Sequence, residues 1–140
     1  MNERDKAINE WFEKADHDLG TAILISTHIP QFQDILAFHC QQATEKYLKA
    51  MMIFLDLEVK RTHILVSLLE LIDEKETIPD ILYDKVERLT GYEVKIRYPN
   101  NIKKLTEEDI KDAIEISQFF REFVIKRMNI TINYHGYPLE

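Results

Sequence analysis

The chain has 140 residues, of which 45% are hydrophobic and 31% are charged, a mixture that predicts one soluble globular domain with its own core. Three glycines and four prolines are too few for a strand-rich sandwich or barrel, and the glycines stand too far apart to form a phosphate-binding loop. A single cysteine excludes an internal disulfide, and a net charge of −7 argues against general binding of duplex DNA.

Apolar residues recur at helical spacing along most of the chain and predict an all-α fold. The first helical segment has one buried stripe, whereas the second is apolar on most sides and is expected at the centre. Short connections predict an antiparallel up-and-down bundle of four to five helices within residues 1–130, followed by a mobile tail over 131–140. The helices are expected over residues 3–27, 32–57, 63–74, 79–90 and 107–128, with a loop over 91–105.

Local signals support two of these helix starts. Thr62 is expected to be the N-cap of the third helix. Thr106 and Asp109 have the spacing of a capping box at the start of the fifth helix.

No apolar run approaches the ~20 residues of a membrane span, and the charged first residues are unlike a signal peptide. We therefore expect a cytoplasmic protein without membrane contact.

A polar block interrupts the apolar second helix between residues 38 and 50. Gln41, Glu45 and Lys49 stand one helical turn apart and form one row. A second row beside it contains His39, Gln42, Lys46 and Lys49. Polar groups covered by neighbouring helices need partners or a wet cleft. The block is therefore either a set of ion pairs and interhelix hydrogen bonds or a cleft for an anionic, nucleotide-like ligand.

Other charged residues are candidates on separate segments. Asp18 lies at the edge of the apolar stripe of the first helix, where it is expected to pair with a cation of another helix, whereas Asp16 is expected to be exposed. Residues 95–104 hold four cations and no acid. Within this run, Arg97 offers a planar fork to a carboxylate or phosphate, and Tyr98 can stack on a base or pack. A solvated surface loop is the alternative.

The histidines and the cysteine predict no metal centre. The five histidines have none of the spacings that build a zinc or carboxylate-bridged site in a helical bundle. His63 is expected in a cap or an interhelix hydrogen bond, and Cys40 in the core. No cofactor is expected apart from the candidate nucleotide.

Four motifs in order along the chain resemble the HEPN domain family, whose name denotes higher eukaryotes and prokaryotes nucleotide-binding. They are Trp11-x-x-x-Ala15-x-x-Asp18-Leu19-x-x-Ala22, His39-Cys40-Gln41-Gln42-Ala43-x-Glu45-Lys46-x-Leu48-Lys49-Ala50, Thr62-His63-x-Leu65 and Arg97-Tyr98-Pro99. The resemblance covers roughly residues 8 to 128. It implies a helical bundle, commonly a homodimer, that is frequently paired with a minimal nucleotidyltransferase in toxin–antitoxin-like modules.

The resemblance also suggests which residues form a ligand site. Gln41, Gln42, Glu45, Lys46 and Lys49 match the family block, and His63, Arg97 and Tyr98 match the later motifs. Many HEPN proteins are metal-independent ribonucleases with an Arg followed, after four to six residues, by a His. No arginine here has a histidine at that distance, which counts against catalysis and makes RNA a weakly supported partner.

Three functions follow from these observations. The first is a nucleotide-binding interaction module, in which Lys46, Lys49 and Arg97 meet phosphates and Tyr98 meets the base or sugar. The second is a metal-independent endoribonuclease that uses His63 or His39 as its base and Arg97 as its phosphate clamp. The third is a purely structural dimerisation bundle, in which the polar block fixes the helix register.

Overall fold

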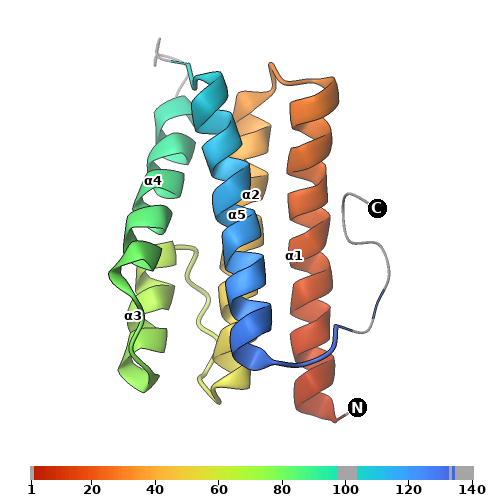
Figure 1. Ribbon diagram of the computed structural model, residues 1–140, viewed down its shortest axis with the longest axis vertical. Coiled ribbons are helices and arrows are strands. Elements are labelled where there is room, and N and C mark those ends of the chain that lie inside the picture. The colour runs from red at the N-terminus through yellow and green to blue at the C-terminus, as the bar shows by residue number, and fades with distance from the viewer. Residues whose placement is uncertain (1, 98–103, 133, 135–140) are drawn as a thin grey trace.

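Five α-helices make up the computed structural model, which describes residues 2–97, 104–132 and 134 (Figure 1). They are α1 (Glu3–His28), α2 (Gln33–Phe54), α3 (Leu65–Lys75), α4 (Asp80–Arg97) and α5 (Glu107–Met128). No strand occurs within the described ranges, so the predicted all-α helical bundle is confirmed. In these same ranges, no helix is both long and apolar enough to cross a membrane.

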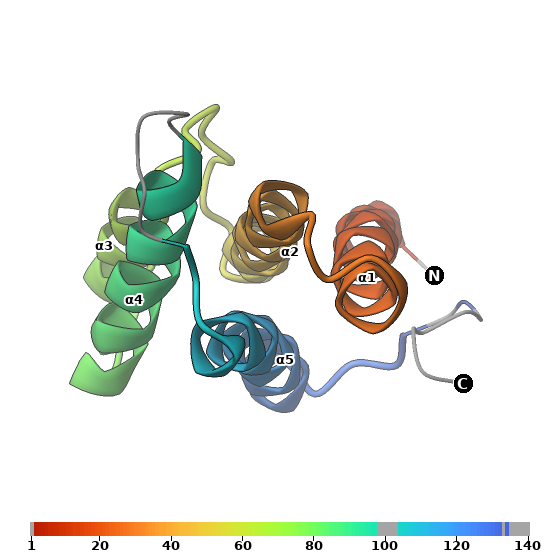
Figure 2. The ribbon, with the colours of Figure 1, turned by 90° about the horizontal axis from the view of Figure 1, so that it is seen from above.

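The second helix is central, as its apolar pattern predicts. It packs against each of the other four helices. Seen from above, α1 and α4 lie on opposite sides of α2, and α5 closes a third side (Figure 2). Tyr47, Leu48 and Met52 of α2 have no exposed area, and Cys40 is equally buried in the core. This position gives α2 several faces to bury and leaves its polar residues to find partners on different neighbours.

The direction of the chain alternates between helices, with one exception. In Figure 1, α1 runs up, α2 down, α4 up and α5 down, whereas the short α3 runs down like α2. The connection over residues 55–64 climbs back along the bundle before α3 begins. His63 therefore lies beside the middle of α2 rather than at its end.

Of the two predicted helix starts, one is confirmed and one is wrong. Thr106 and Asp109 form the predicted capping box at the start of α5. Thr62 is not the N-cap of α3, because that helix begins at Leu65 with Ile64 as its N-cap. The Thr62 hydroxyl instead accepts a hydrogen bond from the Ile64 amide at 3.2 Å and caps a turn before the helix.

The loop predicted over residues 91–105 is wrong in its first half, because α4 continues to Arg97. Gly91 lies in the helix interior at a cost of about 1 kcal/mol relative to alanine. The Tyr92 hydroxyl of this stretch donates to Asp112 of α5 at 2.6 Å, and Arg88, one turn earlier in α4, donates through Nε to the same carboxylate at 2.9 Å. Pro99 restricts only the residue before it, so it does not prevent a helix that ends at Arg97.

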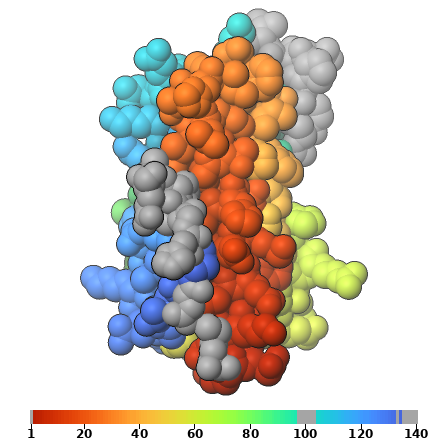
Figure 3. Space-filling model, turned by 90° about the vertical axis from the view of Figure 1, so that its right-hand side faces the viewer, coloured from red at the N-terminus to blue at the C-terminus, as the bar shows by residue number. Residues whose placement is uncertain are grey.

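The face formed by α1 also receives part of the C-terminal segment. Figure 3 shows α1 along the full height of this face, with α5 beside it. The Tyr134 hydroxyl donates to the backbone carbonyl of Phe12 at 3.2 Å and to the carboxylate of Asp16. Residue 133 and residues 135–140 of the predicted tail lie outside the described residues.

Candidate functional site

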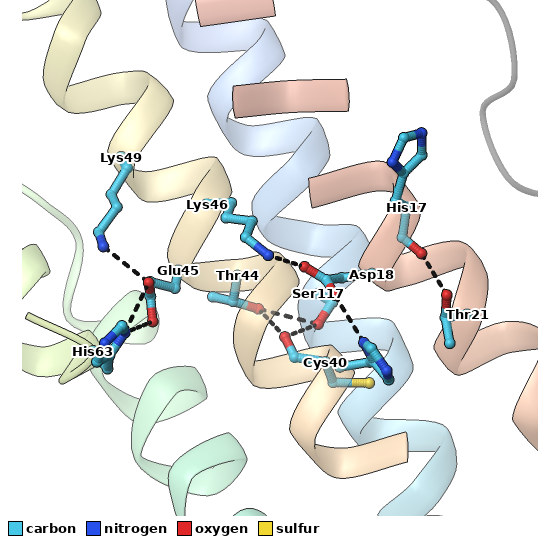
Figure 4. Close-up of polar contacts among 11 residues, drawn as sticks. His17, Asp18, Thr21, Cys40, Thr44, Glu45, Lys46, Lys49, His63 and Ser117 are labelled. Atoms are coloured by element: carbon cyan, nitrogen blue, oxygen red, sulfur yellow. Dashed lines mark hydrogen bonds and ion pairs between the residues drawn. The ribbon is translucent and has the colours of Figure 1, made fainter. Parts of the chain in front are cut away.

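The polar block of α2 divides into two clusters. Figure 4 shows Glu45 with Lys49 and His63 on one side of the helix, and Lys46 with Asp18 on another. The division follows from helix geometry, because neighbouring residues of an α-helix point about 100° apart. The two predicted rows therefore do not form one site: His39 and Lys46 contact Asp18, whereas Gln42 lines a groove with Gln41 and His63.

The first cluster surrounds the buried carboxylate of Glu45, whose side chain is 3% exposed. Lys49 Nζ donates to Glu45 Oε2 at 2.9 Å from the next turn of α2. His63 Nδ1 lies 3.0 Å and 3.2 Å from the two Glu45 oxygens. Because an ionised carboxylate only accepts hydrogen bonds, Nδ1 donates in this contact, and in the neutral imidazole Nε2 is then left as an acceptor. The predicted interhelix hydrogen bond of His63 is thus a bond to Glu45.

The two partners of Glu45 differ sharply in exposure. The His63 side chain is 74% exposed, whereas that of Lys49 is 6% exposed. Lys49 Nζ also lies 5.6 Å from the centre of the Trp11 ring of α1. A buried ammonium that is held by a carboxylate and covered by an aromatic ring is not available to a ligand phosphate.

The second cluster joins α1 to α2 through Asp18. His39 Nδ1 lies 2.8 Å from Asp18 Oδ1, and Lys46 Nζ donates to Asp18 Oδ2. The predicted pairing of Asp18 with a cation of another helix is confirmed. Side-chain exposure here is 12% for Asp18, 24% for His39 and 22% for Lys46. This cluster is therefore less buried than the one around Glu45, but its lysine is also neutralised.

A groove opens beside the first cluster, between α2, the start of α3 and α4. Its larger part has a volume of about 550 Å³ and is lined by Gln41, His63 and residues of both other helices. A smaller part of about 420 Å³ shares Gln41 and His63 and adds Phe38 and Gln42. The Gln41 amide nitrogen donates to the His63 carbonyl at 3.4 Å, and its carbonyl oxygen is buried with no hydrogen-bond partner among the described residues.

The remaining two predicted site residues stand at the end of α4. Arg97 is the last residue of that helix, three residues beyond Val94, which lines the groove. Tyr98 lies outside the described residues.

Sequence reasoning missed a third polar cluster, around Asp16, which is buried rather than exposed as predicted. Arg121 of α5 grips this carboxylate with two hydrogen bonds, of 2.8 Å from Nε and 3.0 Å from its second terminal nitrogen. The hydroxyls of Tyr47 and Tyr134 also donate to Asp16. Burial and the Asp16 charge raise the pKa of Tyr47 far above its usual range. The signal was present, because Asp16 stands four residues after Phe12 and three before Leu19, in the buried stripe itself.

A small neutral network lies between these clusters. The hydroxyls of Thr44 and Ser117 are 3.0 Å apart, and Ser117 donates to the Cys40 carbonyl at 2.8 Å. Burial raises the pKa of the Cys40 thiol to about 12, so this cysteine is a neutral core residue and not a nucleophile. Among the described residues, no group of three or more His, Cys, Asp or Glu side chains can hold a metal ion.

Comparisons with known proteins agree with the resemblance seen in the sequence. The family model described as HEPN domain matches residues 8–128. The crystal structure of an archaeal HEPN homologue is similar to this chain with a TM-score of 0.65 and 21% sequence identity. The similarity covers 86% of this chain and 97% of the archaeal one, and at this identity it supports the fold alone. A search of curated proteins found no match.

Proposed function

Because the chain belongs to the HEPN domain family, we propose that it is an interaction module of that family, which forms a homodimer and works with a minimal nucleotidyltransferase in a toxin–antitoxin-like pair. The observation that carries this proposal is the neutralisation of the polar block. Lys46 is held by Asp18 and Lys49 by Glu45, so neither is left to bind a ligand phosphate. What remains open beside the block is a groove, which suits a partner better than a phosphate.

The proposal that the chain binds a nucleotide depends on fewer residues than the sequence suggested. With Lys46 and Lys49 engaged, phosphate contact falls to Arg97 at the end of α4, with Tyr98 against the base or sugar. The Nε2 acceptor of His63 and the unpartnered oxygen of Gln41 then offer acceptors to amino groups of the ligand. Gln42, in the smaller part of the groove, supplies an amide beside them.

Two measurements test this function. The purified chain is mixed with a minimal nucleotidyltransferase, taken from a neighbouring gene where one exists, and the mass of the complex is measured by light scattering after gel filtration. We expect a stable complex, and a failure of the two proteins to associate would overturn the partner proposal. Calorimetric titration with ATP then tests the nucleotide part on wild type, Arg97→Ala and the matched control Lys46→Met. Binding that weakens in Arg97→Ala but not in Lys46→Met supports it, and no heat at millimolar ATP contradicts it.

A metal-independent ribonuclease is the second candidate, and the geometry of His63 favours it. An exposed imidazole held at Nδ1 by a buried carboxylate leaves Nε2 to act as a general base. We expect any such activity to persist in EDTA, to be lost in His63→Ala and to be reduced in Glu45→Gln. Absence of RNA cleavage by clean wild-type protein would exclude this candidate.

A further inference from the structure

A second groove lies between the end of α1 and the first half of α5. Its volume is about 480 Å³, and among the described residues it shares no lining residue with the groove beside Glu45. In Figure 2, α5 has α1 on one side and α4 on the other, and this groove is on the α1 side. Ser26 of α1 and Pro30 of the following connection line one wall. The other wall belongs to α5 and consists of Glu107, Ile110, Lys111, Ile114, Glu115 and Gln118.

The α5 wall is one continuous stripe of the helix. Its members follow Glu107 at spacings of three, four, seven, eight and eleven residues, which places them on one face of α5. The stripe is about 16 Å long, at about 1.5 Å per residue. Ile110 and Ile114 pack partly on the core along one edge, whereas Lys111 and Glu115 are exposed along the other. The stripe therefore combines an apolar edge with charges in the order acid, cation, acid.

The two sides of α5 use their charges differently. Toward α4, Asp109 and Asp112 form ion pairs with cations of that helix. Toward α1, Lys111 forms no ion pair within the described part of the chain, although Glu107 and Glu115 each stand four residues from it. Exposed charges need no partner, so their exposure alone suggests nothing. The order of these charges along the stripe is what carries the argument.

This order is complementary to itself in an antiparallel copy. When two α5 helices cross antiparallel about a twofold axis at residue 113, residue 111 of each copy lies level with residue 115 of the other. Lys111 of each copy then faces Glu115 of the other copy. Along the apolar edge, Ile110 and Ile114 of the two copies alternate in axial steps of about 3 Å. Glu107 lies nearly level with Gln118 of the other copy, so a carboxylate accepts from an amide.

From this self-complementarity we infer that the groove between α1 and α5 docks a second copy of this chain through antiparallel contact of the two α5 helices. The inference rests on the proposed function, in which the chain forms a homodimer, and it assigns the face through which the dimer forms. The groove beside Glu45 stays open in this dimer, because the two grooves have no described lining residue in common.

Other arrangements satisfy the stripe less well. A twofold axis parallel to α5 sets each residue level with itself, so Lys111 meets Lys111 of the other copy. A twofold axis at residue 109 pairs Lys111 with Glu107, but it sets Ile114 level with residue 104, before α5 begins. Nucleic acid would bring phosphates toward two carboxylates and one ammonium group.

Reversing one charge at a time tests the reciprocal pairing. Lys111→Glu sets a carboxylate against Glu115 of the other copy, and Glu115→Lys sets an ammonium group against Lys111. Both residues are exposed, so neither change disturbs packing. Mixing the two variants restores both ion pairs, since one copy then has two acids at these positions and the other has two cations. Lys14→Glu and Glu13→Lys, exposed on α1 outside the groove, are controls with the same changes of charge.

Sedimentation equilibrium at low ionic strength, where surface charges are least screened, measures the dissociation constant of the dimer. We expect wild type to dimerise and each single reversal at residue 111 or 115 to raise the dissociation constant about tenfold or more. The equimolar mixture and the double variant Lys111→Glu/Glu115→Lys should dimerise as wild type does, and the two controls should be unchanged. Recovery on mixing also shows that both single variants are folded. Weakening without recovery would overturn the inference, because the two residues would then not face each other.

The same measurement separates this inference from the proposed function. A wild-type chain that stays monomeric at millimolar concentration would overturn both the inference and the proposed homodimer. A dimer that both single reversals leave intact would overturn the inference alone, because the homodimer would then form through another face.

Discussion

The buried pair of Glu45 and Lys49 makes the sharpest prediction about the polar block. Glu45→Gln keeps the size of the side chain and one acceptor oxygen but removes the charge. Lys49, with a 6% exposed side chain, is then left without a counter-ion and with only the Trp11 ring near it. Breaking a buried pair from one side costs about 3–5 kcal/mol, and the ring contact and the flexible lysine stem favour the lower end, about 3 kcal/mol. That is a large part of the roughly 5–15 kcal/mol that keeps a domain folded.

Urea denaturation at pH 7 measures this cost as a double-mutant cycle with Lys49→Met. We expect the loss in Glu45→Gln to be recovered in large part by adding Lys49→Met, because the double variant has no buried charge to leave unpaired. Asp18→Asn is the matched comparison. Its cluster is more exposed, so we expect a loss of only about 1–1.5 kcal/mol. A loss below about 1 kcal/mol in Glu45→Gln, or additive effects in the double variant, would refute the reasoning.

Three further predictions concern groups outside the candidate site. Asp16→Asn should lower the free energy of unfolding, measured in urea, by about 3 kcal/mol, because Arg121 loses both bonds to a carboxylate with no exposed area. A loss below about 1 kcal/mol would contradict the role of this cluster. With its pKa raised to about 12 by burial, Cys40 should resist iodoacetamide at pH 8 in the native protein and react once urea unfolds it; native labelling at the unfolded rate would show the thiol to be accessible. Burial raises the pKa of Asp112, but hydrogen bonds from Arg88 and Tyr92 outweigh burial, so the pKa of Asp112 is lowered. The stability that the Asp112 carboxylate adds to the folded state is therefore present above the unfolded pKa and is lost as the pH falls below about 4. The urea midpoint of Arg88→Met should depend less on pH in that acid range than wild type does, and equal slopes would contradict the assignment.

The helices were predictable because each buries a stripe of regular spacing. The bounds of α1, α2 and α5 differ from prediction by three residues or fewer. The error lies in α4, where Pro99 and the Asn100-Asn101 pair favoured a loop that was begun too early, at Gly91. A contact between helices outweighs the local preference there. Arg88 and Tyr92 of α4 donate hydrogen bonds to Asp112 of α5, which lies more than a dozen residues away in sequence. Such contacts override a glycine cost of about 1 kcal/mol.

In the candidate site, contacts between residues of one helix could be predicted from the sequence, whereas contacts between residues of different helices could not. The spacing of Glu45 and Lys49 required that they be neighbours, and the structure pairs them at 2.9 Å. The partner of Asp18 was predictable as a cation but not as Lys46, since that choice depends on how α1 and α2 are rotated. The burial of Asp16 could be read from its place in the apolar stripe of α1, but its partner could not. Its partner Arg121 lies on α5, which covers the side of α1 that a two-helix view leaves open.

The charges of this chain gain a different meaning once their partners are known. From the sequence, Lys46 and Lys49 are two cations in a block that matches a nucleotide-binding family, and they suggest a phosphate site. In the fold, each lysine and a histidine share one carboxylate, Asp18 on one side of α2 and Glu45 on the other. Both lysines are thus neutralised within the fold, and the groove beside them is lined by Gln41, His63 and residues of α3 and α4. The search for function therefore moves from the lysines of α2 to the groove between α2 and α4.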